Sequence, residues 1–107
     1  MNALVKRLSE GEHPITIGDS QHSLVELKKR LEEIGYVFIL FPETQGGTNL
    51  GVRVDKATTD LSQADFDRGT GTVHVEGSLT LNYVKIRCVA DIHLATLHGT
   101  GHLISVE

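Results

Sequence analysis

The sequence predicts an α+β fold, in which a short N-terminal helix and one amphipathic helix pack on a mostly antiparallel sheet of about five to six strands. Apolar and polar residues alternate through the last third of the chain, from Gly71 to Val106, which is the pattern of strands with one buried face. A second stretch, Leu24 to Ile34, carries apolar residues at helical spacing. We expect residues 1–107 to form a single domain, because a chain of this length can enclose one core.

Composition and charge argue against several classes of protein. The chain has 39% hydrophobic and 22% charged residues, as globular proteins do. Its net charge of −4 argues against a nucleic-acid partner, which requires clustered Lys and Arg. The longest strongly apolar run, Tyr36 to Phe41, is far shorter than the roughly 20 residues that span a membrane. The single cysteine, Cys88, excludes an intrachain disulfide and favours a cytoplasmic location.

Two helices are expected before the first long strand. Asn2 can cap a short helix that ends at Gly11, and this helix is too short to be stable unless it packs on the protein or a partner. Ser23 and Glu26 form a capping box at the start of the longer helix, which ends at Gly35. The apolar stripe of that helix comprises Leu24, Leu27, Leu31 and Ile34. We expect the stripe to lie across one face of the sheet.

The middle of the chain predicts a hairpin and a long surface excursion. The unbroken apolar run Tyr36–Phe41 predicts a strand covered on both faces, either central in the sheet or facing another subunit. It pairs with Leu50–Val54 across a glycine-rich loop, which lacks the following helix of a phosphate-binding loop. Lys56 to Gly71 is irregular, with a short helical turn expected near Leu61 and with Phe66 as its anchor on the core.

The polar face of the C-terminal sheet carries the candidate chemistry. His74, Asp91 and His93 are the candidates for acid–base catalysis, because a carboxylate beside a histidine can orient it for proton transfer. The candidates for ligand binding on the same face are Glu76, Lys85 and Arg87. Two other uses of this face stay open: a surface exposed to water, or a homodimer interface in which opposite charges pair.

Three histidines near the last turn are the candidates for metal binding. His93, His98 and His102 flank or approach the turn His98–Gly101, where a hairpin would bring them towards one another. Zinc requires three or four such ligands at about 2 Å. We expect surface imidazoles, with no metal and no cofactor. Cys88 has the parity of the apolar face and is expected to be buried and unreactive.

The function expected from the sequence is that of a small cytoplasmic, non-catalytic binding or assembly protein that forms homo-oligomers. The basis is a clear structural pattern without a strong catalytic motif. The alternative is a small enzyme or small-molecule binder, with a pocket between helix and sheet and with His74, Asp91 and His93 in acid–base or metal chemistry. The order of elements is shared by cystatin-like, hot-dog-like and roll-like folds, and this likeness carries no function.

Overall fold

The computed structural model describes residues 3–17, 24–44, 47–81 and 83–105. Its helices are α1 (Ala3–Ser9), α2 (Leu24–Lys29) and the π-helical turn η1 (Arg30–Ile34). Its strands are β1 (His13–Ile17), β2 (Tyr36–Phe41), β3 (Thr48–Val54), β4 (Ala64–Asp65), β5 (Thr70–Leu81), β6 (Val84–His93) and β7 (His98–Ser105). The predicted α+β class with an antiparallel sheet is confirmed.

Within the described residues, the sheet closes into a six-stranded barrel in the order β3-β2-β1-β7-β6-β5. All its pairings are antiparallel. Most ring neighbours are consecutive in the chain, but β1 pairs with β7, from the other end of the chain, and β4 lies outside the ring on the outer edge of β5. The ring closes where Arg53 pairs with Ser78 and Val54 pairs with Gly77. The alternation in the sequence predicts strands but says nothing about this closure.

The core fills the inside of the barrel with aliphatic side chains. Most residues that the alternation predicts to point inward in β5 and β6 are buried: Val73, Val75, Ile86, Cys88, Ala90 and Ile92. The end of the predicted series is not, since Leu79 and Leu81 are only partly buried and Tyr83 lies in the turn after β5 and is 97% exposed. The strand β2 pairs with β1 and β3, as each strand of a closed barrel pairs with two neighbours, and its predicted cover on both faces is found only on the inward face. Its inward side chains are buried, whereas on the outward side Tyr36 is 39% exposed. The outer face of β2 is therefore only partly covered within one chain.

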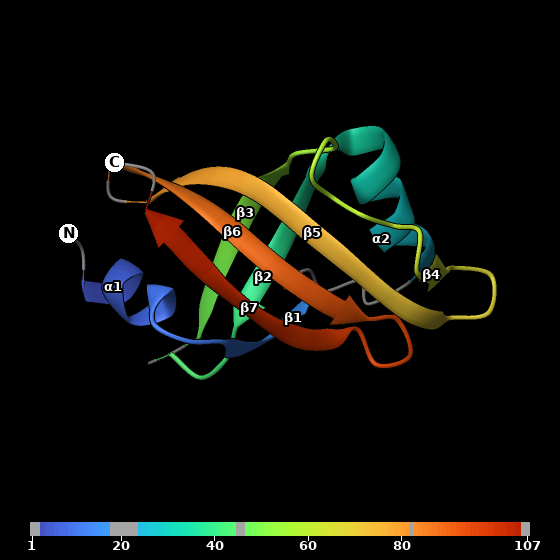
Figure 1. The fold of residues 1–107 in the computed structure, drawn as a ribbon, viewed down its shortest axis with the longest axis horizontal. Coiled ribbons are helices and arrows are strands. Elements are labelled where there is room, and N and C mark those ends of the chain that lie inside the picture. Colours follow the sequence, from blue (N-terminus) through green and yellow to red (C-terminus); the bar gives the residue numbers. More distant parts are fainter. Residues whose placement is uncertain (1–2, 18–23, 45–46, 82, 106–107) are drawn as a thin grey trace.

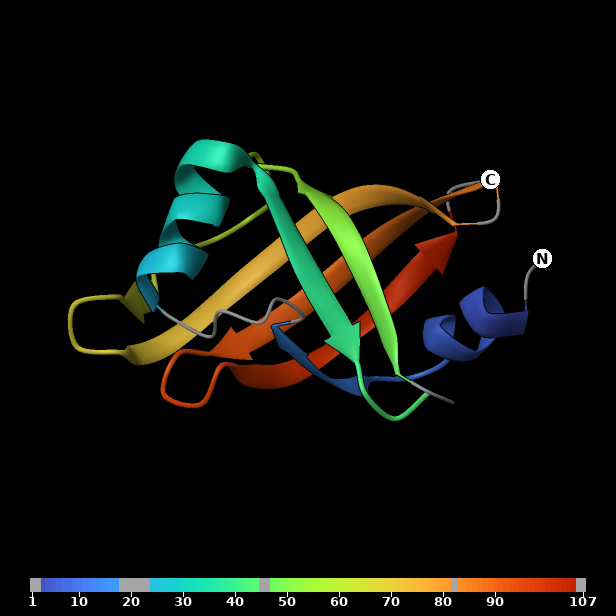
Figure 2. The same cartoon turned by 180° about the vertical axis from the view of Figure 1, so that it is seen from behind.

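The helices lie at opposite ends of the long axis of the molecule (Figures 1 and 2). Leu27 and Leu31 reach the core as predicted, but Ile34 is 51% exposed, and its predicted place on the buried stripe is wrong. The reason is the π-helical last turn, in which Gly35 N–H donates to the Arg30 carbonyl and Ile34 is rotated off the stripe. The predicted caps Asn2 and Ser23 lie outside the described residues. None of the helices described is of a length and apolarity that would cross a membrane.

The excursion after β3 covers the outer edge of β5 (Figure 1). Its predicted helical turn is wrong: the residues form turns, a bridge between Asp60 and His74, and the short strand β4. Some of these backbone groups close local turns, as in Ala64 N–H to the Leu61 carbonyl, and others pair with the edge of β5, as in Asp60 N–H to the His74 carbonyl. Phe66 packs partly buried against the core, which confirms its predicted role as the anchor.

Candidate functional site

The outward face of β5 and β6 brings several of the predicted charged residues into register. His74 lies opposite Asp91, and Thr80 lies opposite Lys85. Arg87 lies opposite Ser78 on the same face, two residues along β6 from Lys85. The period-two pattern of each strand places these groups outside the barrel, because the inward positions are apolar.

His74 lies between two carboxylates. Its Nδ1 is 2.8 Å from Asp91 Oδ1, and its Nε2 is 2.6 Å from Glu76 Oε2. Both nitrogens can donate to these oxygens only when the ring is doubly protonated. The hydrogen bonds with Glu76 and then Asp91 raise the pKa of His74 above its ordinary value. The site therefore favours the imidazolium form.

Arg87 extends this chain of contacts to the end of β3. Its Nε and Nη2 donate to Glu76 Oε1 at 3.2 and 3.0 Å, and Nη2 also donates to Asp55 Oδ2 at 3.1 Å. The hydrogen bonds from His74 and Arg87 lower the pKa of Glu76 despite its partial burial. We refer to Asp91, His74, Glu76, Arg87 and Asp55 as the polar network. It ties β5 and β6 to the chain segment that leaves β3.

The predicted catalytic set is brought together only in part. His74 and Asp91 are in contact, but His93 lies beside Thr72, with 3.4 Å between Nδ1 and the threonine Oγ1. In the imidazolium form His74 has no lone pair that could accept a proton. The contacts of His74 thus favour a structural ion-pair network over a general base.

The predicted metal ligands point to different neighbours. The predicted turn at His98–Gly101 is wrong, because these residues are the start of β7 and the turn lies at 94–97. His93 and His98 are paired across that turn. His102 Nδ1 lies 2.9 Å from Glu12 Oε1, an ion-pair distance, but makes no hydrogen bond with it. Among the residues that the structure describes, no group of His, Cys, Asp or Glu side chains is arranged to hold a metal ion.

Cys88 is buried on the inner face of β6, as its parity predicts. Burial raises the pKa of its thiol to about 12. A thiol with this pKa is almost entirely protonated near neutral pH, and the thiolate is the reactive form. Cys88 is therefore a core residue and not a nucleophile.

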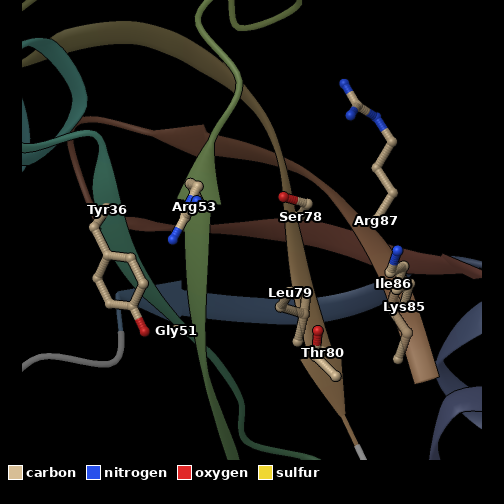
Figure 3. Close-up of a pocket in the computed structure, with 9 residues that line it drawn as sticks. All are labelled: Tyr36, Gly51, Arg53, Ser78, Leu79, Thr80, Lys85, Ile86 and Arg87. Carbon is tan, nitrogen blue, oxygen red and sulfur yellow. The ribbon is translucent and has the colours of Figure 1, made fainter. Parts of the chain in front are cut away.

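A groove opens beside the polar network, where β3 and β5 separate (Figure 3). The groove has a volume of about 510 Å³. The cations that line it are Arg53, Lys85 and Arg87, and the hydroxyl groups are those of Tyr36, Ser78 and Thr80. The partly buried Leu79 supplies apolar surface, and the buried Ile86 lies behind it. The groove thus combines cationic and hydroxyl walls with an apolar patch.

The register of the barrel places five residues side by side on neighbouring strands, at the end of the groove where β3 and β5 pair. We call these five residues the groove row. Starting from β2, the paired residues are Tyr36, Arg53, Ser78, Arg87 and Ile104. The ends of this row are apolar and partly exposed, since Tyr36 is 39% and Ile104 is 42% exposed. A Cβ atom at Gly51 would clash with the Tyr36 hydroxyl, so a glycine is needed for the ring to lie over β3 at the rim.

The cations of the groove differ in how they are engaged. Arg87 is held by Glu76 and Asp55. Arg53 and Lys85 are exposed, and neither has an ion-pair partner among the described residues. Lys85 and Arg87 belong to the ligand-binding residues predicted from the sequence. Arg53 and Tyr36 were missed, because only the closure of the barrel brings β3, and the Tyr36 ring that lies over it, next to β5.

A comparison of the sequence with known protein family models and with curated proteins found no match. The geometry of the groove and of the polar network is therefore the basis for assigning a function.

Proposed function

We propose that this protein is a non-catalytic binding protein, and that the groove between β3 and β5 holds a ligand with a carboxylate or phosphate group. The observation that carries this proposal is the group of cations, Arg53, Lys85 and Arg87, lining one groove of a chain with net charge −4. Guanidinium groups bind oxyanions through paired, charge-assisted hydrogen bonds. The neighbouring hydroxyls can donate further hydrogen bonds to the same ligand.

Binding is better supported than the alternative of acid–base catalysis by His74, Asp91 and His93. His74 is engaged on both nitrogens, and His93 contacts Thr72 instead of joining it. A general base needs a free lone pair within hydrogen-bond reach of the substrate. The groove also lies between two strands, whereas the catalytic hypothesis places its pocket between helix and sheet.

Self-association and a cytoplasmic setting belong to the same proposal. The exposed Tyr36 and Ile104 at the ends of the groove row support a contact between two copies, since exposed apolar groups favour association. Size-exclusion chromatography with light scattering should show a dimer or larger species, and a strict monomer at high concentration would contradict it. The likeness to cystatin-like, hot-dog-like or roll-like folds stays a prediction at the level of fold.

Titration with inorganic phosphate and with succinate at constant ionic strength, followed by ¹⁵N–¹H NMR, tests the binding site. The largest shifts are expected at Gly51, Arg53, Ser78 and Thr80. Lys85→Glu should weaken binding about tenfold or more, because one charge-assisted contact is replaced by repulsion. Lys29→Glu, which makes the same charge change on α2, is the matched control and should have little effect. Equal shifts at all surface cations, or none, would sink the proposal.

A further inference from the structure

We propose that the groove binds an extended acidic peptide segment of a partner protein, which adds as a strand along the open edge of β5. This inference rests on the proposed binding function and specifies its ligand. It follows from the directions of the backbone groups in β3 and β5 and from the charges around them.

The backbone groups of β5 alternate between two neighbours. Leu94 N–H donates to the Gly71 carbonyl, whereas Thr72 N–H points the other way and donates to the Gln63 carbonyl. Because N–H and C=O directions alternate along a strand, odd-numbered residues of β5 bond to β6 and even-numbered residues point away from it. The even-numbered residues therefore form the outer edge of β5.

That outer edge is covered from Thr72 as far as Ser78. His74 N–H donates to the Asp60 carbonyl, Glu76 N–H donates to Thr59 Oγ1, and Ser78 pairs with Arg53. Thr80 is the next residue in the series, and the described pairing with β3 stops before it. The N–H and C=O of Thr80 consequently face the groove.

The backbone groups of β3, on the opposite side of the groove, also alternate between two neighbours. Val54 N–H donates to the Gly35 carbonyl, while Asp55 N–H donates to the Glu76 carbonyl. Odd-numbered residues of β3 thus face β5, and Gly51 would be the partner of Thr80 if the ladder continued. Instead the groove separates them. Open strand edges of this kind are templates for strand addition by an extended chain.

The side chains around the groove indicate the sequence of the added strand. Successive side chains of a strand point to opposite faces. One face would meet the apolar surface of the partly buried Leu79, and the other would meet Arg53 and Lys85. A segment that alternates acidic and aliphatic residues matches both faces. Backbone pairing selects a polypeptide, and the cations select acidic side chains.

Fluorescence anisotropy with labelled synthetic peptides tests this inference. A peptide of alternating glutamate and valine should bind. A block peptide of the same composition should bind about tenfold more weakly or worse, because it cannot satisfy both faces at once. Arg53→Glu should abolish binding of the alternating peptide, while Arg68→Glu, the same change in the exposed β4–β5 turn, should not.

N-methylation of alternate peptide residues separates backbone pairing from charge attraction, because it removes peptide N–H donors without altering the protein or its succinate site. Methylation of one alternate set should abolish binding and methylation of the other should not.

The outcomes distinguish this inference from the proposed function. Succinate binding without peptide binding would overturn the peptide inference alone. Absence of both would overturn the proposed function as well. Equal affinity for the alternating and block peptides, or no effect of either methylation, would reduce the interaction to charge attraction and overturn strand addition.

Discussion

At the scale of single residues, the protonation of His74 links the polar network to pH. The raised pKa of His74 means that its imidazolium stabilises the folded state fully below pH 6.5, and this contribution is lost as the pH rises through the raised value. The lowered pKa of Glu76 acts in the opposite direction: its contribution is present above pH 4.5 and is lost as the pH falls through the lowered value. The network therefore contributes most between these two limits.

His74→Gln should destabilise the protein more at pH 5.5 than at pH 8.5. The variant lacks the titrating group, so the difference from wild type in free energy of unfolding should shrink across this interval. Urea unfolding at both pH values, followed by circular dichroism, measures the difference. A difference that is independent of pH would contradict the assignment of an imidazolium to this site.

A direct NMR titration of the His74 ring provides the control. Glu76→Gln should lower the pKa of His74 more than Asp91→Asn does, because the hydrogen bond with Glu76 is the larger cause of its shift.

The sequence alone indicated that these side chains share one face of the sheet, because the parity of a strand position decides which face its side chain is on. It carried no signal for Asp55, which joins the network only because β3 closes on β5.

At the scale of secondary structure, α1 depends on its contacts with the barrel. A helix of 7 residues is not stable alone in water, and Val5 and Leu8 attach it to the core with 0% and 1% exposure. Leu8→Ala should cost about 2–4 kcal/mol through lost burial and a residual cavity. Lys6→Ala, on the exposed face of the same helix, should change stability by about 0.5 kcal/mol at most.

Urea unfolding of the two variants measures this difference. Similar midpoints for Leu8→Ala and Lys6→Ala would show that α1 does not contribute to the stability of the barrel. An increase in amide exchange confined to α1 in Leu8→Ala would show that the helix detaches while the strands remain folded.

The elements themselves were largely predictable, because their signals are local. Alternation predicted the inward faces of most of β5 and β6, and the apolar run predicted that β2 is a strand. The predictions were wrong where backbone groups form hydrogen bonds that the spacing of apolar residues in the sequence does not indicate. Ile34 left its stripe through a π-helical turn, and residues near Leu61 paired with the edge of β5 instead of forming a helical turn.

At the scale of the whole molecule, the closure of the barrel determines where the groove lies. Only the pairs Arg53–Ser78 and Val54–Gly77 join β3 to β5 in the described structure, whereas β5 and β6 pair along almost their whole length. The paired residues of β3 and β5 are far apart in sequence, and neither strand has a motif that marks the other. Closure depends on strand length and curvature, which no short pattern in the sequence encodes.

We call the two pairs that join β3 to β5 the β3–β5 seam. Gly77 is the residue on which this seam depends most directly. It is buried opposite Val54, and a Cβ atom there would clash with the Arg53 carbonyl oxygen and with Val52 Cγ1. Relief of a clash with backbone requires β3 and β5 to move apart. Gly77→Ala should therefore destabilise the protein by about 1–3 kcal/mol, which exceeds the roughly 0.4–1 kcal/mol gained by restricting the unfolded chain.

Ser78→Ala is the matched control, because Ser78 is the next residue and its side chain is exposed. It should alter the free energy of unfolding by no more than about 0.5 kcal/mol. Hydrogen exchange should locate the damage: amides of β3 and of the outer edge of β5 should exchange faster in Gly77→Ala, while the β6–β7 ladder stays protected. If Gly77→Ala were as stable as Ser78→Ala, the β3–β5 seam would not close the barrel in solution, and the groove beside it would lose its upper boundary.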